Sequence, residues 1–154
     1  VIYKGYHGDA AITVGVGQVN PESERLMEVT AESLRVGIEA AQPGELTWDI
    51  SKAIQKYVEG QGYSVVREYT GHGIGSQMHE DPQIPNYHAP RIGARVRLRP
   101  GMTFALEPMV IIGDWRTRVL DDKWTVVTAD GTRSAHFEHT VAVTKNGPEI
   151  MTRL

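Results

Sequence analysis

Histidines beside glycine or a carboxylate are the first residues in this sequence whose types could carry chemistry. The densest group lies between Gly71 and Glu80, where His72 stands between two glycines and His79 precedes a glutamate. Glycines have no side chain with which to cover a neighbouring imidazole, so His72 is expected to be open to a ligand. Because a turn with two surface imidazoles would look the same, this stretch alone predicts a candidate site and not a particular reaction.

Two familiar motifs can be tested against this stretch, and both fail. A zinc-binding helix of the His-Glu-x-x-His type would need histidine where Gln83 stands, and Pro82 would break the helix. A dinucleotide-binding loop would need glycine where Ser76 stands, followed by a helix that Pro82, Pro85 and Pro90 forbid. Neither motif is therefore predicted here.

A glutamate also stands inside an apolar segment that otherwise has the pattern of a strand. Glu107 lies within 103–111, and alternation places its side chain on the face of Thr103 and Ala105. An ionised carboxylate buried without a partner is very costly. Glu107 is therefore expected either on a solvated face of the sheet or beside a positive charge.

The same pattern recurs near the end of the chain. Glu138 lies within 135–143, where alternation places it on one face with His136 and Thr140. Two strands of one sheet, each with a glutamate among apolar residues, are better explained by a shared cation than by coincidence.

A set of oxygen and nitrogen ligands follows from these segments once Asp9, at the entry to an early strand, is added. The sequence contains no cysteine, so a metal could be held only by histidine and carboxylates. The candidate ligands Asp9, His72, Glu107 and Glu138 suit Mn, Fe, Co or Zn. The alternative is that they are unrelated polar residues on one sheet.

Composition restricts the class of protein further. The chain has 154 residues, with 16 Lys and Arg against 19 Asp and Glu, so its formal charge is −3. This balance provides no basic footprint for nucleic acid and no polybasic patch for a membrane. There is no apolar run near 18 residues and no signal-peptide pattern, so a soluble cytoplasmic protein is expected.

Two amphipathic helices are predicted in the first half of the chain. Asn20 can cap a helix that begins at Pro21, and apolar residues follow at helical spacing to about residue 41. A second helix is expected from about Thr47, as its cap, to Gly60.

The remaining segments predict an α+β layout, with the helices packed on one face of a mostly antiparallel sheet. Residues 71–90 are rich in glycine, proline and histidine and are expected to form a functional loop. The expected strands are 1–3 and 10–16 in a hairpin, 63–69, 103–111, 114–119, 124–129 and 134–144.

The order of the motifs closely resembles that of type I methionine aminopeptidases, which have the pita-bread (creatinase/aminopeptidase) fold. Proline-specific aminopeptidases also carry a Gly-His-Gly loop and a Glu-Pro strand, but they look less similar around 124–131 and 137–140. The matching strings are His7-Gly8-Asp9, Gly71-His72-Gly73-Ile74-Gly75, His79-Glu80-x-Pro82, Leu98-x-Pro100-Gly101-Met102-Thr103-Phe104, Glu107-Pro108-Met109, Trp124-Thr125-Val126-Val127-Thr128-x-Asp130-Gly131 and Phe137-Glu138-His139-Thr140.

This resemblance implies a hydrolase with two divalent ions, Co, Mn, Fe or Zn, that removes N-terminal methionine from nascent proteins. In the family, a metal-bridging hydroxide attacks the first peptide bond. The residues that match family ligands are Asp9, His72, Glu107 and Glu138. Glu107 is further expected to take the proton of the attacking water and pass it to the leaving amine.

Substrate contacts and partners are also implied by the resemblance. His79 matches the histidine that hydrogen-bonds the scissile amide and stabilises the tetrahedral species. Trp124 and Met78 would border the pocket for the methionine side chain, with core packing as the alternative. The implied partners are nascent polypeptides, with association at the ribosome and a monomeric state at full length.

The sequence departs from the family pattern at two places. The family's first metal-binding aspartate falls ahead of Val1, so residues 1–154 are expected to be a partial catalytic domain: the C-terminal half plus the last hairpin of the N-terminal half. Such a chain is expected to be inactive by itself, and a non-catalytic module that binds metal or a protein partner is the alternative. His136 stands where relatives often have glutamine.

Overall fold

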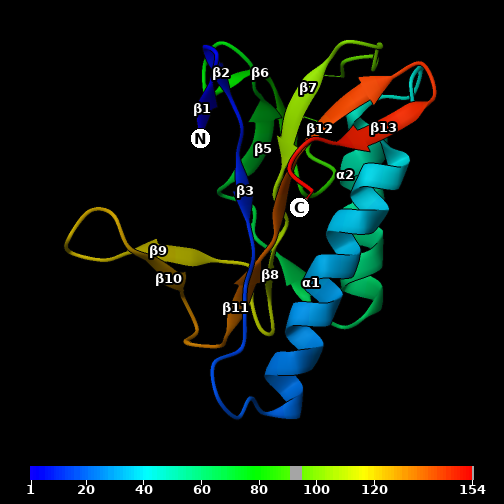
Figure 1. The fold of residues 1–154 in the computed structure, drawn as a ribbon. Coiled ribbons are helices and arrows are strands. Elements are labelled where there is room, and N and C mark those ends of the chain that lie inside the picture. The colour runs from blue at the N-terminus through cyan, green and yellow to red at the C-terminus, as the bar shows by residue number, and fades with distance from the viewer. Residues whose placement is uncertain (91–94, 154) are drawn as a thin grey trace.

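Two helices pack against one side of an antiparallel sheet assembly in the computed structural model, which describes residues 1–90 and 95–153 (Figure 1). The helices are α1 (Pro21–Ala40) and α2 (Thr47–Gly60). The strands are β1 (Ile2–Tyr3), β2 (Tyr6–His7), β3 (Ala10–Ala11), β4 (Ser64–Val65), β5 (Thr70–Gly73), β6 (Glu80–Pro85), β7 (Thr103–Leu106), β8 (Met109–Ile111), β9 (Thr117–Val119), β10 (Val126–Thr128), β11 (Ser134–His136), β12 (Glu138–Thr144) and β13 (Gly147–Ile150).

The largest sheet has the order β13-β12-β7-β5-β6, with β3 paired to β12. A second sheet has the order β11-β8-β4, and β1-β2 and β9-β10 form separate hairpins. The predicted α+β layout is thus confirmed, because α1 contacts β7, β8, β11 and β12 while α2 contacts β4 and β6. The core lies between these helices and the sheets.

The helices form where apolar periodicity and capping predict them. Asn20 is the N-cap of α1, its side chain accepts from the Ser23 N–H at 2.8 Å, and Pro21 is the first helical residue. The expectation that Thr47 caps α2 is wrong, because Thr47 is already helical and Leu46 is the cap residue. Asp49 performs the capping instead, since its carboxylate accepts from the Leu46 N–H at 3.0 Å.

The first hairpin is shorter than predicted. Its second strand is Tyr6–His7, which pairs with Ile2–Tyr3, whereas the expected strand 10–16 is reduced to Ala10–Ala11. These two alanines pair with Glu138 and His139 of β12. A strand persists only where a neighbour satisfies its backbone, and beyond Ala11 the backbone ladder gives way to hydrogen bonds from the side chain of Thr13.

The segment 71–90 is not the loop that its composition predicts, because β5 and β6 form a hairpin within it. The glycines around His72 have a packing role. A Cβ on Gly71 would lie 2.5 Å from the carbonyl oxygen of Ala105 in β7, and a Cβ on Gly73 would meet the backbone of Asp81. Only glycine permits this close approach of neighbouring backbones, so these glycines serve the packing of β5. The expectation that His72 is open is wrong, because the residue is buried at 7% exposure.

The expected strands 103–111 and 134–144 are each broken in the middle. The first is interrupted at Glu107 and Pro108, because proline has no N–H for the ladder, and the second at Phe137. Strand 63–69 is reduced to Ser64–Val65, and the strands expected at 114–119 and 124–129 are reduced to β9 and β10. The final strand β13 is not predicted from the sequence.

Replacing Gly71 by alanine should destabilise the protein by about 2 kcal/mol, since the new methyl group would press on the backbone of β7. Urea unfolding of Gly71→Ala and wild type measures this difference. Gly60→Ala is the matched control, because a Cβ there meets nothing within 4 Å and alanine favours the end of α2. Equal midpoints for Gly71→Ala and wild type would contradict the packing role.

Candidate metal centre

Two glutamates face each other across adjacent strands at the centre of the candidate site. In β7 and β12, Leu106 pairs with His139, and in β8 and β11, Met109 pairs with His136. The register is the same on both sides of the break, so Glu107 lies opposite Glu138. Like charges directly opposite in a sheet destabilise it, which makes this pair unfavourable without a cation.

Asp9 is brought to the same face by β3. Its N–H donates to the hydroxyl oxygen of Thr140 at 2.8 Å, and that hydroxyl donates to the carbonyl oxygen of Asp9 at 2.8 Å. Thr140 is a buried residue of β12, two positions from Glu138 and therefore on the same face of the strand. These two hydrogen bonds hold the backbone of Asp9 against Thr140, and they fix the position from which its side chain extends.

His72 reaches this face from the other side of β7. It pairs with Ala105 of β7, which is fully buried. The side chain of Ala105 is too small to fill the space between His72 of β5 and Glu138 of β12. The Nδ1 atom of His72 lies 2.9 Å from the carbonyl oxygen of Gly73, and because a carbonyl can only accept, Nδ1 must carry the proton. The other ring nitrogen, Nε2, lies 3.5 Å from the Oε1 atom of Glu107.

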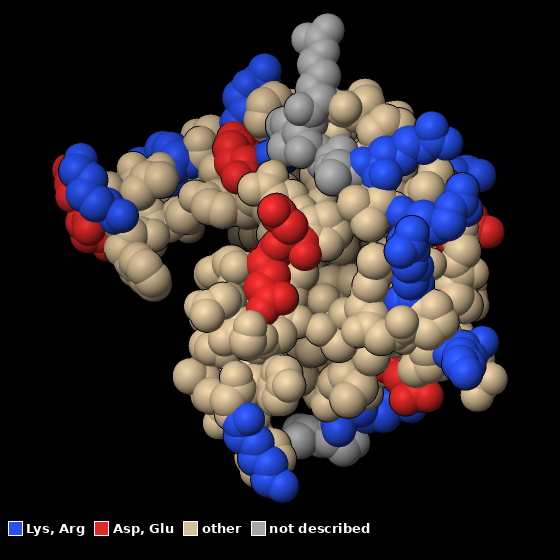
Figure 2. Space-filling model, turned by 90° about the horizontal axis from the view of Figure 1, so that it is seen from above, with Lys and Arg blue, Asp and Glu red and all other residues tan. Residues whose placement is uncertain are grey.

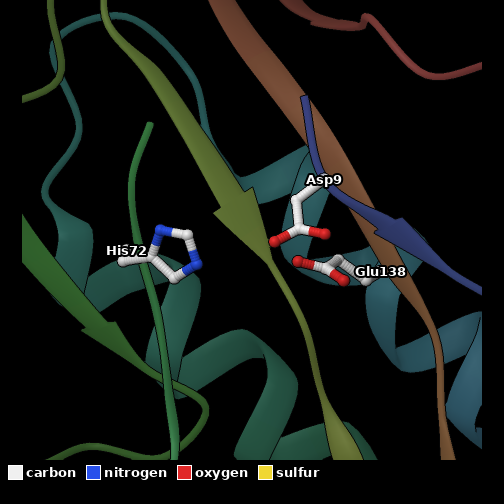
Figure 3. A group of neighbouring side chains, drawn as sticks. All are labelled: Asp9, His72 and Glu138. Atoms are coloured by element: carbon white, nitrogen blue, oxygen red, sulfur yellow. The ribbon is translucent and has the colours of Figure 1, made fainter. Parts of the chain in front are cut away.

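A divalent cation fits these donors. One ligand atom from each of Asp9, His72 and Glu138 lies within 4.8 Å of the others, and Figure 3 shows the two carboxylates close together with the imidazole across β7 from them. Glu107 adds a fourth donor, and the third carboxylate, beside His72. The imidazole nitrogen of His72 and the converging carboxylate oxygens match the donor set of a borderline divalent ion.

The electrostatics of the centre agree with this assignment. Burial raises the pKa of Glu107 to about 8, with further contributions from Glu138 and Asp9. Burial, followed by the charge of Asp9, raises the pKa of Glu138 to about 7. A cation would reverse both effects, because it favours the ionised carboxylates.

His79 lies against the metal centre without joining the ligand group. Its ring centroid is 4.4 Å from that of His72 at an interplanar angle of 60°, and its side chain is exposed. The turn before it is held by Glu80, whose carboxylate accepts from the Gln77 N–H at 2.8 Å and the Ser76 hydroxyl at 3.2 Å. This geometry leaves the His79 imidazole available to a molecule at the centre.

The two residues expected to line a substrate pocket lie apart from each other. Met78 is 42% exposed and immediately precedes His79. Trp124 is 87% exposed and lies in the turn between β9 and β10, a hairpin that projects from the body of the protein (Figure 1). Among the described residues, Trp124 does not join the group of side chains around the metal centre.

Two further contacts of Glu107 are added by the structure. Asn86, a buried residue, donates from its side-chain amide to the carbonyl oxygen of Glu107 at 3.1 Å, and no feature of the sequence marks it for this role. His136 places its Nε2 atom 3.8 Å from Oε2 of Glu107. Alternation in the sequence places His136 and Glu138 on one face of the sheet, and this pattern was the available signal for the contact between His136 and Glu107.

Acidic side chains also gather on the outer surface. Figure 2 looks down on the end of the molecule at which β1, β2 and β6 lie, and it shows one group of acidic residues near the middle of that face and others at its margin. Lysine and arginine side chains lie mostly toward the margin.

The fold and the converging carboxylate and imidazole donors define an α+β protein with a group of side chains that could hold a cation. The model of metallopeptidase family M24 matches residues 1–145, and this chain belongs to that family. The resemblance to methionine aminopeptidases and the pita-bread fold expected from it are thereby confirmed.

Individual relatives agree. Methionine aminopeptidase 1 of Bacillus subtilis is 54% identical over 150 residues, which cover 97% of this chain and 60% of the relative. The crystal structure of methionine aminopeptidase from Thermotoga maritima matches with a TM-score of 0.94 and 51% identity, covering 99% of this chain and 61% of that one. Prolidase from Pyrococcus furiosus shares the fold, with a TM-score of 0.76, 24% identity, and coverage of 99% and 39%.

The chain thus spans about three fifths of the length of the curated relatives it matches. Over residues 1–90 and 95–153, neither helix is long and apolar enough to cross a membrane.

The raised pKa values predict how the metal-free protein responds to pH. Glu107 and Glu138 keep their protons in the folded state when unfolded carboxyls have lost theirs, so the folded state binds more protons between about pH 5 and 8. Stability should therefore fall as pH rises through this window. Urea midpoints measured in a chelator should fall more for wild type than for Glu107→Gln; equal slopes would contradict the burial of an ionisable Glu107.

Proposed function

We propose that this chain carries the metal centre of an aminopeptidase that removes N-terminal methionine from polypeptides. The observation that carries the proposal is the convergence of Asp9, His72, Glu107 and Glu138 on one face of the sheet. Relatives named methionine aminopeptidase, at 54% and 53% identity, supply the reaction class.

The proposed ligands are two kinds of donor. Asp9, Glu107 and Glu138 provide oxygen, and His72 provides its unprotonated Nε2 atom. Divalent ions at such a site polarise a peptide carbonyl and promote the ionisation of water near neutral pH. Co, Mn, Fe and Zn are all compatible with these donors, and the family relationship points to two ions.

Glu107 is proposed as the proton acceptor. Its carboxylate is only 16% exposed, beside His72, so a water that attacks the scissile carbonyl would meet a base shielded from bulk solvent. Glu107 would take the proton from this water and return it to the amine that leaves. General-base catalysis of this kind contributes about 10²–10⁴-fold to a rate.

His79 is proposed to bind the substrate and not the metal. Its exposed imidazole, stacked edge-on against His72, can donate to the oxygen of the scissile amide and stabilise the charge that develops there. Met78 and Trp124 are proposed to border the methionine side chain. Because Trp124 lies on a projecting hairpin, its part in the pocket would require a further surface to close over it.

Methionine is favoured over a proline-containing substrate by the degree of similarity. The chain is 51% identical to the methionine aminopeptidase of known structure from Thermotoga maritima and 24% identical to the prolidase from Pyrococcus furiosus. The second likeness supports the fold alone. A non-catalytic module would have no use for a proton acceptor and a substrate-binding histidine beside the ligands.

We further propose that residues 1–154 form the C-terminal portion of a metallopeptidase catalytic domain, since relatives are longer. In this arrangement a carboxylate outside the chain would complete the second metal position. The proposed substrates are nascent polypeptides in the cytoplasm, met near the ribosome by a monomeric enzyme.

Glu107→Gln should lower turnover of a Met-Ala-Ser peptide by about 10²–10⁴-fold in the protein containing this chain, through loss of the proton acceptor. Released methionine, measured with Co²⁺ or Mn²⁺ present, gives the rate. Glu28→Gln, on the exposed surface of α1, is the matched control and should be fully active. Wild-type turnover in Glu107→Gln would refute the role, and hydrolysis of Xaa-Pro peptides in place of Met-Ala-Ser would favour the proline-specific alternative.

His79→Ala should lower kcat by about 10²-fold while the metal content stays at the wild-type value, because the imidazole stabilises the transition state without ligating the metal. Elemental analysis of the purified variant beside its kinetics separates the two roles. A loss of metal from His79→Ala would show that His79 is a ligand.

A further inference from the structure

The imidazole of His136 lies next to the carboxylate of Glu107. Its Nε2 atom is buried and, within the part of the chain that the structure describes, has no hydrogen-bond partner. The same atom lies 3.8 Å from Oε2 of Glu107. A buried N–H or lone pair without a partner is costly, so an atom placed in this way needs a role.

The backbone of His136 is held firmly. The hydroxyl of Thr13 donates to the His136 carbonyl oxygen at 2.8 Å and accepts from its N–H at 3.0 Å. On the other side His136 pairs with Met109 of β8. The backbone of His136 is thus held on both sides, which fixes the position from which its imidazole ring extends.

The carboxylate of Glu107 lies between two imidazoles. His72 approaches Oε1 with its Nε2 atom at 3.5 Å, and His136 approaches Oε2 at 3.8 Å. Rotation about the terminal bond of a glutamate is soft, so a modest turn would bring the second contact to about 3 Å, a normal hydrogen-bond length. Without a donor on Oε2, the same softness would let the carboxylate swing away from the metal centre.

We propose that His136 is a positioning residue for Glu107, whose Oε2 atom accepts a hydrogen bond from the His136 Nε2–H while Oε1 stays on the His72 side. The proposal rests on the assignment of Glu107 to the metal centre made above. Carboxylates that ligate metals are commonly held by such outer hydrogen bonds, and removal of the outer partner typically weakens metal binding by about 10–100-fold. A direct metal–imidazole bond from His136 is the competing arrangement.

Two substitutions separate these arrangements. His136→Ala removes the donor, and His136→Gln supplies an amide N–H of similar reach. His139→Gln is the matched control, because His139 lies in the next strand, β12, with its side chain on the opposite face, where its Nδ1 atom lies 2.8 Å from the hydroxyl oxygen of Thr152. The probe is Co²⁺ alone, with its affinity measured by calorimetry and its ligand set by visible absorption; urea unfolding verifies that each variant is folded.

We expect His136→Ala to weaken Co²⁺ binding by about 10-fold or more, whereas His136→Gln and His139→Gln bind as wild type does. The absorption spectrum of the saturated protein should be the same in all four proteins, since the ligands do not change. Wild-type affinity in His136→Ala would overturn the proposal. Equal weakening in the alanine and glutamine variants would also overturn it, and a changed spectrum would then assign His136 as a ligand.

The same titration tests the underlying metal centre separately. Failure of the wild-type protein to bind Co²⁺ would overturn the assignment of Asp9, His72, Glu107 and Glu138, and the role of His136 with it. Normal binding by wild type and by His136→Ala would overturn the role of His136 alone.

Discussion

The repulsion between two carboxylates that face each other across one ladder is the constraint on which the rest of this structure depends. Glu107 and Glu138 lie opposite each other on adjacent strands, and Asp9 adds a third negative charge beside them. Burial prevents water from screening this charge, and it raises the pKa of both glutamates. A sheet that keeps such a group in place has either to hold protons on it or to hold a cation.

The surrounding fold keeps these donors from moving apart. β5 can approach β7 because Gly71 leaves room for the backbone of Ala105, and this approach brings His72 to the carboxylates. Pro108 interrupts the ladder just after Glu107, where Asn86 takes over as the partner of the Glu107 carbonyl. The favourable free energy of packing elsewhere in the fold thus offsets the unfavourable free energy of this arrangement of charges, as is usual for a functional site.

The family relationship separates scaffold from specificity. A prolidase with 24% identity shares the fold, so the sheet and helices alone do not select a substrate. Under the proposed function, this selection would fall to side chains at its rim, here Met78, His79 and the hairpin carrying Trp124.

The sequence by itself predicted the helices and the α+β class, because periodicity and strand alternation are local properties. It also marked Asp9, His72, Glu107 and Glu138, which the structure brings close together. It misjudged 71–90, whose glycines suggest a loop when considered alone. Only the tertiary structure decided that Gly71 and Gly73 lie in β5, between β7 and β6 in the sheet, and that His136 and Asn86 both contact Glu107. Alternation shows which face a side chain takes, but its neighbours follow from register and strand order, which depend on pairing between segments far apart in the chain.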